Sequence, residues 1–307
     1  MTAHSILDDV EIGVGTWSWG DTRIWGYGQT YGDADLKGAF DASLRAGVRL
    51  FDTAEAYGFG KSERLLGRFA RETGERITIA TKFFPWPWRV SGRQLLNALR
   101  RSLARLGVDH VDVYQMHWPV PPRSVSAWME PLATAVSEGL TAHAGVSNYS
   151  ARQMRTAFDR LAARGVRLAS NQVEYSLLKR NVEFNGVLGA CRELNVRLIA
   201  YSPLAMGMLS GKYTPASPPP GPRGLRYRRP MLRRLAPLLG LLDEIGQECR
   251  KTRNQVALNW LICKGALPIP GAKSAAHATE NAGAAGWRLS PAQVAALDEA
   301  SLAYCRK

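Results

Sequence analysis

The stretch Phe51-Asp52-Thr53-Ala54-Glu55-Ala56-Tyr57-Gly58 decides how the rest of the chain is interpreted. It includes the end of an apolar run over residues 48–51, which predicts a short buried strand. The strand ends in an acid, Asp52, and five residues later Tyr57 stands in a turn beside a glycine. Because an acid at a strand end is common, this stretch alone indicates only a strand followed by a loop.

The chain has 307 residues, of which 46% are hydrophobic and 21% charged, and this balance is typical of a soluble globular protein. No apolar run approaches the roughly 18 residues that a membrane span needs, and the N-terminus has no signal-peptide pattern. The four cysteines are scattered, without metal-ligand spacing. We therefore expect free thiols in a reducing, cytoplasmic environment, no metal site and no membrane partner.

Apolar runs that predict strands alternate with amphipathic segments that predict helices. The predicted strands cover residues 10–15, 48–51, 77–81, 111–116, 144–146, 166–171, 196–200 and 267–269. The predicted helix caps are Asp33, Ser62, Ser91, Ser150, Thr252 and Ser290. Strict alternation predicts a parallel sheet covered by helices. Eight repeats at this length favour a closed α/β barrel, the (β/α)8 TIM barrel, over an open doubly wound sheet. We expect a single domain over residues 1–307.

Polar residues follow the last apolar residue of six predicted strands. They are Asp52, Lys82, His117, Asn148, Gln172 and Tyr201. In a barrel these strand ends surround one mouth, which is where barrel enzymes have their active sites. Each residue also has an ordinary structural interpretation, such as a cap or a packed histidine. Their shared position on six strands indicates one functional site.

The residue types suggest a chemistry. A tyrosine with an ordinary pKa of about 10 is a poor proton donor at neutral pH, and a lysine beside it would lower that pKa. Lys82 would act on Tyr57 in this way, with Asp52 as the partner that keeps the lysine charged. His117 could orient a carbonyl oxygen by a hydrogen bond. Since no side chain donates hydride, reduction of the carbonyl would require a nicotinamide cofactor.

Seven motifs occur in a fixed order along the chain. They are Phe51–Gly58, Ala80–Lys82, Leu106–Asp109 through Met116–Pro119, Gly145–Tyr149, Asn171–Tyr175, Ala200–Leu204 and Pro268–Lys273. With these motifs the sequence resembles the aldo-keto reductases over essentially its whole length. The resemblance is closer to the bacterial, plant and potassium-channel-β-like branch than to the mammalian aldose-reductase branch. It implies a barrel in which Tyr57 is the general acid, Lys82 and Asp52 tune it, and His117 positions the substrate carbonyl.

The resemblance also implies NADPH/NADP+ lying extended across the barrel mouth. The positions that match cofactor contacts are Thr16, Trp17, Asp52, Ser147, Asn148, Gln172, Tyr201, Ser202, Leu204, Lys212, Gly271, Lys273, His277, Glu280 and Asn281. Among these, Tyr201 would stack on the nicotinamide ring. Lys273 would meet the 2′-phosphate, which favours NADP over NAD. His277 stands where the family often has a glutamine.

Aromatic residues crowd the predicted loops at the same mouth. We expect Trp19, Trp25, Trp86 and Trp118 to line the substrate pocket, with core packing as the alternative for some of these aromatics. An aromatic pocket predicts faster reduction of aromatic or medium aliphatic aldehydes than of free sugars.

The formal net charge is +14, and most of the basic residues lie on predicted helix faces. The exception is a Pro- and Arg-rich connection at about residues 213–237. Its arginines are Arg223, Arg226, Arg228, Arg229, Arg233 and Arg234. Two interpretations of this connection remain open: a flap that attracts the phosphates of the cofactor, and a solvated loop. No nucleic-acid-binding module accompanies the charge, so we expect no nucleic-acid partner.

Three functions compete at this stage. The first is an NADPH-dependent oxidoreductase that reduces an aldehyde or ketone, a small-molecule carbonyl, to an alcohol. The second is an NADP-binding regulatory or partner subunit with little turnover. The third is a barrel aldolase that uses Lys82 as a Schiff base. The substrate, the direction in the cell and the oligomeric state are not specified by the sequence.

Overall fold

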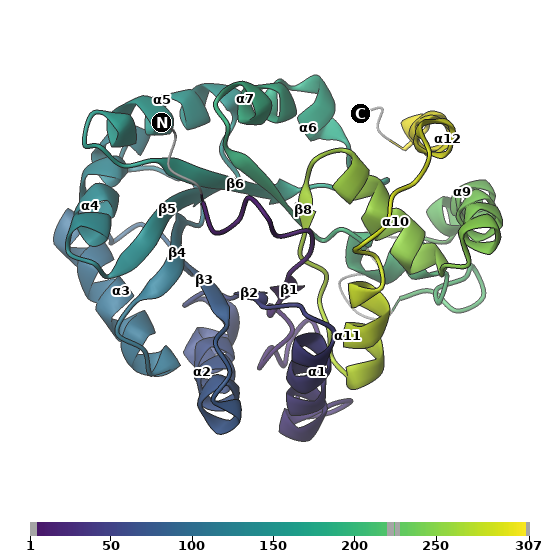
Figure 1. The fold of residues 1–307 in the computed structure, drawn as a ribbon, viewed down its shortest axis with the longest axis horizontal. Coiled ribbons are helices and arrows are strands. Elements are labelled where there is room, and N and C mark those ends of the chain that lie inside the picture. Colours follow the sequence, from purple (N-terminus) through teal and green to yellow (C-terminus); the bar gives the residue numbers. More distant parts are fainter. Residues whose placement is uncertain (1–4, 220–223, 225–227, 305–307) are drawn as a thin grey trace.

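The computed structural model describes residues 5–219, 224 and 228–304. At its centre is one sheet of eight parallel strands, which occur in the sheet in their order along the chain and curl into a ring (Figure 1). The strands are β1 (Val14–Gly15), β2 (Leu50–Asp52), β3 (Thr78–Phe83), β4 (Val111–Met116), β5 (Thr141–Ser147), β6 (Leu168–Glu174), β7 (Arg197–Tyr201) and β8 (Leu267–Pro268). The predicted (β/α)8 barrel is confirmed.

The ring closes between its first and last strands through glycines. Gly15 and Gly271 form a parallel bridge, and the Gly15 amide donates to the carbonyl of Pro270 at 3.1 Å. A Cβ atom on Gly15 would lie 2.8 Å from the carbonyl oxygen of Ile269, which is too close for a real side chain. Closure therefore requires a glycine at position 15.

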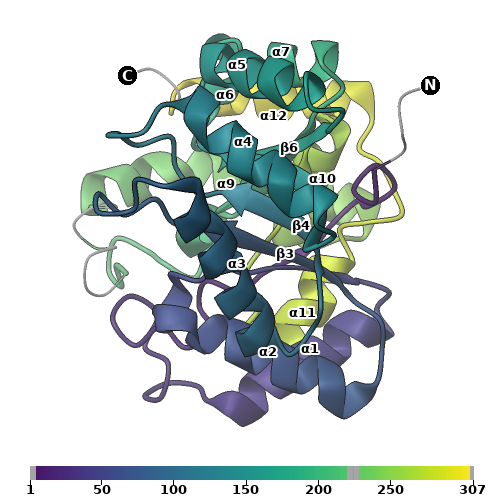
Figure 2. The same cartoon turned by 90° about the vertical axis from the view of Figure 1, so that its left-hand side faces the viewer.

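Helices surround the sheet on the outside, and in Figure 2 α3 and α4 lie in front of β3 and β4. They are α1 (Asp33–Arg45), α2 (Lys61–Thr73), α3 (Gly92–Leu106), α4 (Val125–Ser137), α5 (Ala151–Ala162), α6 (Asn181–Phe184), α7 (Val187–Glu193), α9 (Arg229–Cys249), α10 (Arg253–Cys263), α11 (Ala275–Ala282) and α12 (Pro291–Leu302). Two short 3-10 helices, η1 (Tyr57–Gly60) and η2 (Ala205–Ser210), lie in loops that follow β2 and β7. None of the described helices is long and apolar enough to cross a membrane.

The N-terminal segment fills one end of the barrel and leaves the other to polar residues. Leu7 is fully buried and packs with Leu50, Val113 and Leu267 in a small apolar cluster. The segment crosses the middle of the ring in Figure 1. Since apolar side chains close this end, the functional site is confined to the carboxyl ends of the strands.

The strand boundaries differ from the predicted ones in an informative way. The first strand begins at Val14 rather than at residue 10, whereas β2, β3, β6 and β7 continue through Asp52, Lys82, Gln172 and Tyr201. These polar residues are thus members of the strands rather than the first loop residues. The apolar pattern ends before the strand does because the barrel interior near the mouth holds polar side chains.

The predicted helix caps are confirmed at Ser150, Thr252 and Ser290, whose hydroxyls accept a hydrogen bond from the backbone three residues later. Ser91 also directly precedes its helix, α3. The prediction is wrong at Asp33, which is the first residue of α1, and at Ser62, which lies inside α2.

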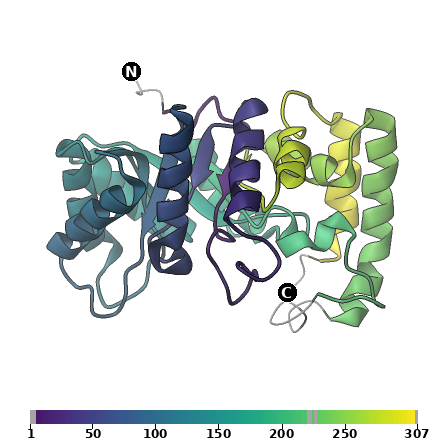
Figure 3. The same ribbon diagram turned by 90° about the horizontal axis from the view of Figure 1, so that it is seen from below.

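The connection at residues 213–237 is helical over its last part, because α9 begins at Arg229 and not at about residue 238. Its stripe of buried leucines continues past Pro237, which lies inside the helix. In Figure 3 α9 stands beside α12, outside the barrel. The described arginines of this segment, at positions 228, 229, 233 and 234, are exposed and do not line the main cavity. Arg223 and Arg226 lie outside the described residues.

Candidate active site

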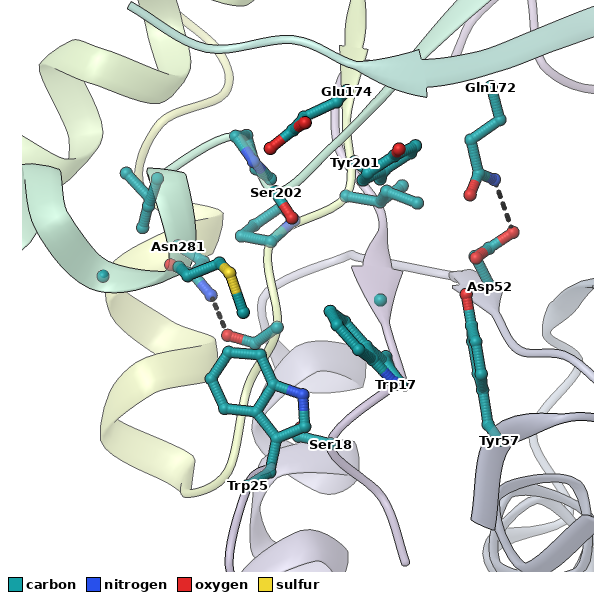
Figure 4. A pocket seen from close by; sticks show the side chains of 18 of the residues that line it. Trp17, Ser18, Trp25, Asp52, Tyr57, Gln172, Glu174, Tyr201, Ser202 and Asn281 are labelled. Atoms are coloured by element: carbon teal, nitrogen blue, oxygen red, sulfur yellow. Dashed lines mark hydrogen bonds between the residues drawn. The ribbon is translucent and has the colours of Figure 1, made fainter. Parts of the chain in front are cut away.

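A cavity of about 810 Å³ opens at the carboxyl ends of the strands. The predicted site residues that line it are Trp17, Trp25, Asp52, Tyr57, His117, Trp118, Ser147, Asn148, Gln172, Tyr201, Ser202, Leu204, Lys212, Gly271, Lys273, His277, Glu280 and Asn281. Figure 4 shows Asp52 and Tyr57 on one side and Trp25 and Asn281 on the other. Residues from distant parts of the sequence therefore share one elongated cavity.

Lys82 lies behind the cavity wall, completely buried. Its Nζ donates to Asp52 Oδ2, to the Thr53 carbonyl at 2.9 Å and to Tyr57 Oη at 3.4 Å. Burial lowers the pKa of Lys82, whereas the carboxylate of Asp52 acts in the opposite direction. The lysine, its acid partner and the tyrosine are thus in direct contact.

The expected lowering of the Tyr57 pKa is not what the structure gives. Burial, and then the negative charge of Asp52, raise the pKa of Tyr57 well above its ordinary value of 10.0. These effects outweigh the ammonium of Lys82, which contacts the hydroxyl at 3.4 Å. The phenol is therefore protonated at neutral pH, as a proton donor must be before it acts.

His117 stands across from Tyr57, with ring centroids 5.7 Å apart and the planes nearly perpendicular. Burial, together with the positive charge of Lys82, lowers the pKa of His117 well below 6.5. The imidazole is consequently neutral at neutral pH and can donate a single N–H hydrogen bond. Tyr57 and His117 thus present two neutral donors to the same part of the cavity.

The second carboxylate oxygen of Asp52 accepts two amide hydrogen bonds. Gln115 Nε2 donates to Oδ1 at 3.0 Å, and Gln172 Nε2 donates to it at 2.8 Å. Gln115 lies next to Gly145 across the β4–β5 pair, and a Cβ on that glycine would come within 2.8 Å of Gln115 Cγ. The space left by Gly145 therefore lets Gln115 reach Asp52.

Beside this group, β5, β6 and β7 bring amides and hydroxyls together. Asn148 Nδ2 donates to the His117 carbonyl at 3.1 Å, and Tyr201 Oη donates to Asn148 Oδ1 at 3.0 Å. Ser147 Oγ donates to the carbonyl of Gln172 at 2.9 Å. This cluster offers amide donors and acceptors and an aromatic ring next to Tyr57.

The far end of the cavity carries positive charge. Lys273 Nζ donates to the Trp25 carbonyl at 2.9 Å and lies 4.7 Å from the ring centre of Trp25. Lys212 and His277 line the same end, and burial, together with the charge of Lys212, lowers the pKa of His277. Glu280 accepts a hydrogen bond from Asn254 Nδ2 at 3.0 Å. Two lysines at one end and proton donors at the other suit a long ligand with phosphates.

Comparison with known proteins agrees with this geometry. The Aldo/keto reductase family matches residues 11–302 of the chain. The chain belongs to this family. Its relatives include the chloroplastic pyridoxal reductase of Arabidopsis thaliana, which is 44% identical over 292 residues, 91% of this chain and 79% of that protein.

Solved structures of aldo-keto reductases have the same fold as this chain. A glycerol dehydrogenase from Gluconobacter oxydans matches with a TM-score of 0.84 at 25% identity, over 96% of this chain and 92% of that chain. An aldo-keto reductase from Klebsiella pneumoniae in complex with NADPH matches with a TM-score of 0.73 at 28% identity, over 94% of this chain and 90% of that chain. The family resemblance seen in the sequence motifs is thereby confirmed.

Besides Lys82, three predicted site residues of this aldo-keto reductase do not line the cavity. Thr16 is fully buried, and its hydroxyl is hydrogen-bonded to the Asp52 carbonyl and to Ser62 Oγ. Trp19 is also fully buried and donates from Nε1 to the Ala272 carbonyl, so it belongs to the core. Trp86 packs against Phe84 at a tilt, with ring centroids 4.3 Å apart, and Phe84 is the one that lines the cavity.

The structure adds residues that were absent from the predicted set. Glu174, Met206 and Asn254 line the cavity, and Gln115 supports Asp52 from behind it. Phe84, one of the aromatics of the predicted loops at the mouth, also lines the cavity. Glu174 belongs to a motif already recognised, and it follows Gln172 with the spacing of two residues that puts both on one face of a strand. Gln115 stands in β4 two residues before His117, so the same spacing could have identified it.

Proposed function

We propose that this aldo-keto reductase is an NADPH-dependent oxidoreductase that reduces an aldehyde or ketone to an alcohol. The observation that carries the proposal is the contact of Tyr57 with Lys82, in a site that His117 faces and whose far end holds Lys212 and Lys273. Bound NADPH would supply the hydride. The family name and the NADPH complex of the Klebsiella relative support this choice of cofactor.

The residues of the cavity fit such a cofactor. Asn148 and Gln172 offer amide groups to a nicotinamide carboxamide, and the ring of Tyr201 offers a stacking face. Lys273 offers an ammonium to a 2′-phosphate, and this contact supports NADP over NAD. The predicted contacts of Ser202, Leu204, Lys212, Gly271, Glu280 and Asn281 are proposed on the same basis, since all line the cavity.

Tyr57 would transfer its proton to the carbonyl oxygen of the substrate as hydride reaches the carbonyl carbon. The phenolate left behind would be stabilised by Lys82, whose charge Asp52 maintains. The neutral imidazole of His117 would donate a hydrogen bond to the same oxygen and so fix its position. Solvent would then return a proton to Tyr57.

The substrate side of the cavity is aromatic. Trp17, Phe84 and Trp118 line it together with the rings of Tyr57 and His117, and Trp25 packs edge to face on Trp17. Flat apolar walls favour an aromatic or medium aliphatic aldehyde over a free sugar. The name of the Arabidopsis relative, a pyridoxal reductase, supports an aromatic aldehyde such as pyridoxal.

Replacing Tyr57 by phenylalanine tests the proposal. The wild-type protein should oxidise NADPH with a panel of aldehydes, followed at the nicotinamide absorbance. Tyr57→Phe should lower kcat by about 100- to 10,000-fold, because the proton donor is lost. NADPH binding, measured by fluorescence titration, should stay within about threefold, because the hydroxyl is not needed to hold the cofactor.

The same assay separates the alternatives. A regulatory subunit would bind NADPH but turn over none of the aldehydes, and Tyr57→Phe would then change nothing. An aldolase would be trapped by borohydride with substrate and without NADPH. The complete burial of Lys82 and its contact with Asp52 speak against a free nucleophilic amine.

A further inference from the structure

A nearly buried ion pair lies beside the active site without lining it. Arg89 forms a bidentate pair with the carboxylate of Glu55. Its Nη1 donates to Oε1, and its Nη2 donates to Oε2 at 3.1 Å. The side chains of Glu55 and Arg89 are only 8% and 14% exposed. Burying two charges is expensive, and such a pair is weak evidence for added stability. A role in positioning its neighbours is therefore worth testing.

The pair holds the backbone of Phe84 from both sides. The Phe84 amide donates to Glu55 Oε1 at 2.8 Å, and Arg89 Nη1 donates to the Phe84 carbonyl at 2.9 Å. The guanidinium of Arg89 also lies 4.8 Å from the ring centre of Phe83. Both peptide groups of one aromatic residue are thus fixed by one ion pair.

Phe84 is the link between that pair and the substrate. Its side chain lines the cavity and meets the His117 ring edge to face, with centroids 5.4 Å apart. On its other side it contacts Trp86, which stacks on Trp88. Movement of the Phe84 backbone would therefore move the wall against which a substrate ring packs.

Glu55 also belongs to the segment that carries the proton donor. It stands two residues before Tyr57, and its amide donates to the Lys82 carbonyl at 3.5 Å. The pair consequently joins the loop after β2, which presents Tyr57, to the loop after β3, which presents Phe84. Proton donor and aromatic wall are held at a fixed separation.

We propose that Glu55 and Arg89 are positioning residues that give the enzyme its preference for aromatic over small aldehydes, by holding Phe84 against His117. The inference rests on the proposed reductase activity and names the element that selects its substrate. A small aldehyde makes little contact with Phe84, so its reduction depends only on Tyr57, His117 and the cofactor.

The decisive variant is Arg89→Met, which removes the guanidinium and keeps much of the apolar stem. The matched control is Arg155→Met, because Arg155 and Glu193 also form a bidentate ion pair, with two contacts of 2.6 Å, but on the exposed surface. Benzaldehyde and propanal serve as the aromatic and the small substrate. For Arg89→Met we expect KM for benzaldehyde to rise about tenfold or more, the loss typical of hydrogen bonds to charged groups.

The kcat values for both aldehydes, KM for propanal and the Kd of NADPH should stay within about threefold in Arg89→Met. Arg155→Met should match the wild type throughout. Phe84→Ala should reproduce the benzaldehyde defect with the ion pair intact, and Arg89→Lys should recover part of it if the variant retains a contact with Glu55. A benzaldehyde KM that is unchanged in Arg89→Met, or an equal loss for both aldehydes, would overturn the proposal.

A binding measurement keeps the two proposals apart. Quenching of tryptophan fluorescence by benzyl alcohol, in the presence of NADP+, measures how tightly an aromatic ligand binds to the cavity wall, and it needs no turnover. If the wild type reduces no aldehyde, the proposed function fails, and weaker benzyl alcohol binding in Arg89→Met but not in Arg155→Met still supports the positioning role. Equal binding in both variants would reject it. Melting temperatures of the variants identify any that are simply unfolded.

Discussion

Asp52 is the residue on which the contacts of the active site converge. One carboxylate oxygen receives the ammonium of Lys82, and the other receives the amides of Gln115 and Gln172. A buried carboxylate needs such partners to remain ionised. In the proposed mechanism the charge of Lys82, and through it the readiness of Tyr57 to release a proton, therefore depends also on Gln115 and Gln172.

Gln115→Leu should lower kcat for aldehyde reduction by about tenfold, because a hydrogen bond to a charged group is worth about 1.5–3 kcal/mol. NADPH affinity should change little, since Gln115 does not line the cavity. The control is Ser170→Ala, whose buried hydroxyl lies close to the same space and has no hydrogen-bond partner among the described residues. Steady-state kinetics and a cofactor titration decide the matter. Comparable kcat values for the two variants would contradict the role of Gln115.

For single residues, the sequence predicted which side chains meet better than it predicted how their pKa values shift. The sequence could place Asp52, Tyr57, Lys82 and His117 together because each lies at or just beyond the carboxyl end of a strand. The direction of the Tyr57 pKa shift could not, since it depends on burial, and burial depends on the whole fold. Trp19 was misassigned for the same reason, because a tryptophan in a loop next to the site can turn inward.

The helices α2 and α3 pack closely where α2 meets the end of α3. A Cβ on Gly67 would lie 2.0 Å from the carbonyl oxygen of Leu106, a backbone atom that cannot easily move. Gly67→Ala should therefore reduce the free energy of unfolding by about 1–3 kcal/mol, despite the better helix propensity of alanine.

The matched control is Gly189→Ala in α7, where an added Cβ would meet no atom of the described residues within 4 Å apart from its own helix backbone and chain neighbours. It should leave stability unchanged or raise it by up to about 1 kcal/mol. Urea denaturation of both variants measures the difference. Equal stability of the two would mean that α2 shifts away from α3 at no cost.

Element boundaries were predictable where local chemistry sets them. The capping serines and Thr252 gave the starts of several helices, because a cap is a short-range contact. The start of α9 was missed, since its first turns are basic on the exposed side and Pro237 interrupts them. Only the buried leucine stripe, formed against α10 and α12, shows that these turns are helical.

The whole molecule should lose stability on mild acidification. Burial lowers the pKa values of His117, His143 and His277 below 6.5 in the fold. Each of these histidines binds a proton more readily in the unfolded chain, so protonation favours unfolding below about pH 6.5 and not above it. The loss continues as the pH falls toward the lower pKa of the folded state.

Denaturation midpoints measured from pH 7.5 to pH 5 should therefore fall with pH. Each histidine that stays neutral in the fold lowers the free energy of unfolding by at most about 1.4 kcal/mol for each pH unit below about 6.5. His143→Asn removes one of these histidines at a position outside the cavity. The denaturation midpoint of this variant should therefore fall less steeply with pH than that of the wild type. Parallel curves for the two proteins would exclude His143 as a source.

The barrel itself was predictable because strands and helices alternate in a pattern that each segment carries locally. The contact that closes it was not predictable, because it joins Gly15 to Gly271, which are far apart in the sequence. Nor was the packing of Leu7 against the start of β2 and β8. Both contacts join distant parts of the chain, and the hydrophobic periodicity of the sequence carries no information about such contacts.

The hydrogen bond between Lys273 and Trp25 links the proposed 2′-phosphate site to the proposed substrate wall. Lys273 holds the carbonyl of Trp25, while the indole of Trp25 packs on Trp17 of that wall. Re-engineering Lys273 to accept a cofactor without the 2′-phosphate would release that tryptophan. An attempt to convert the enzyme to NADH would thus also broaden the range of aldehydes that it accepts.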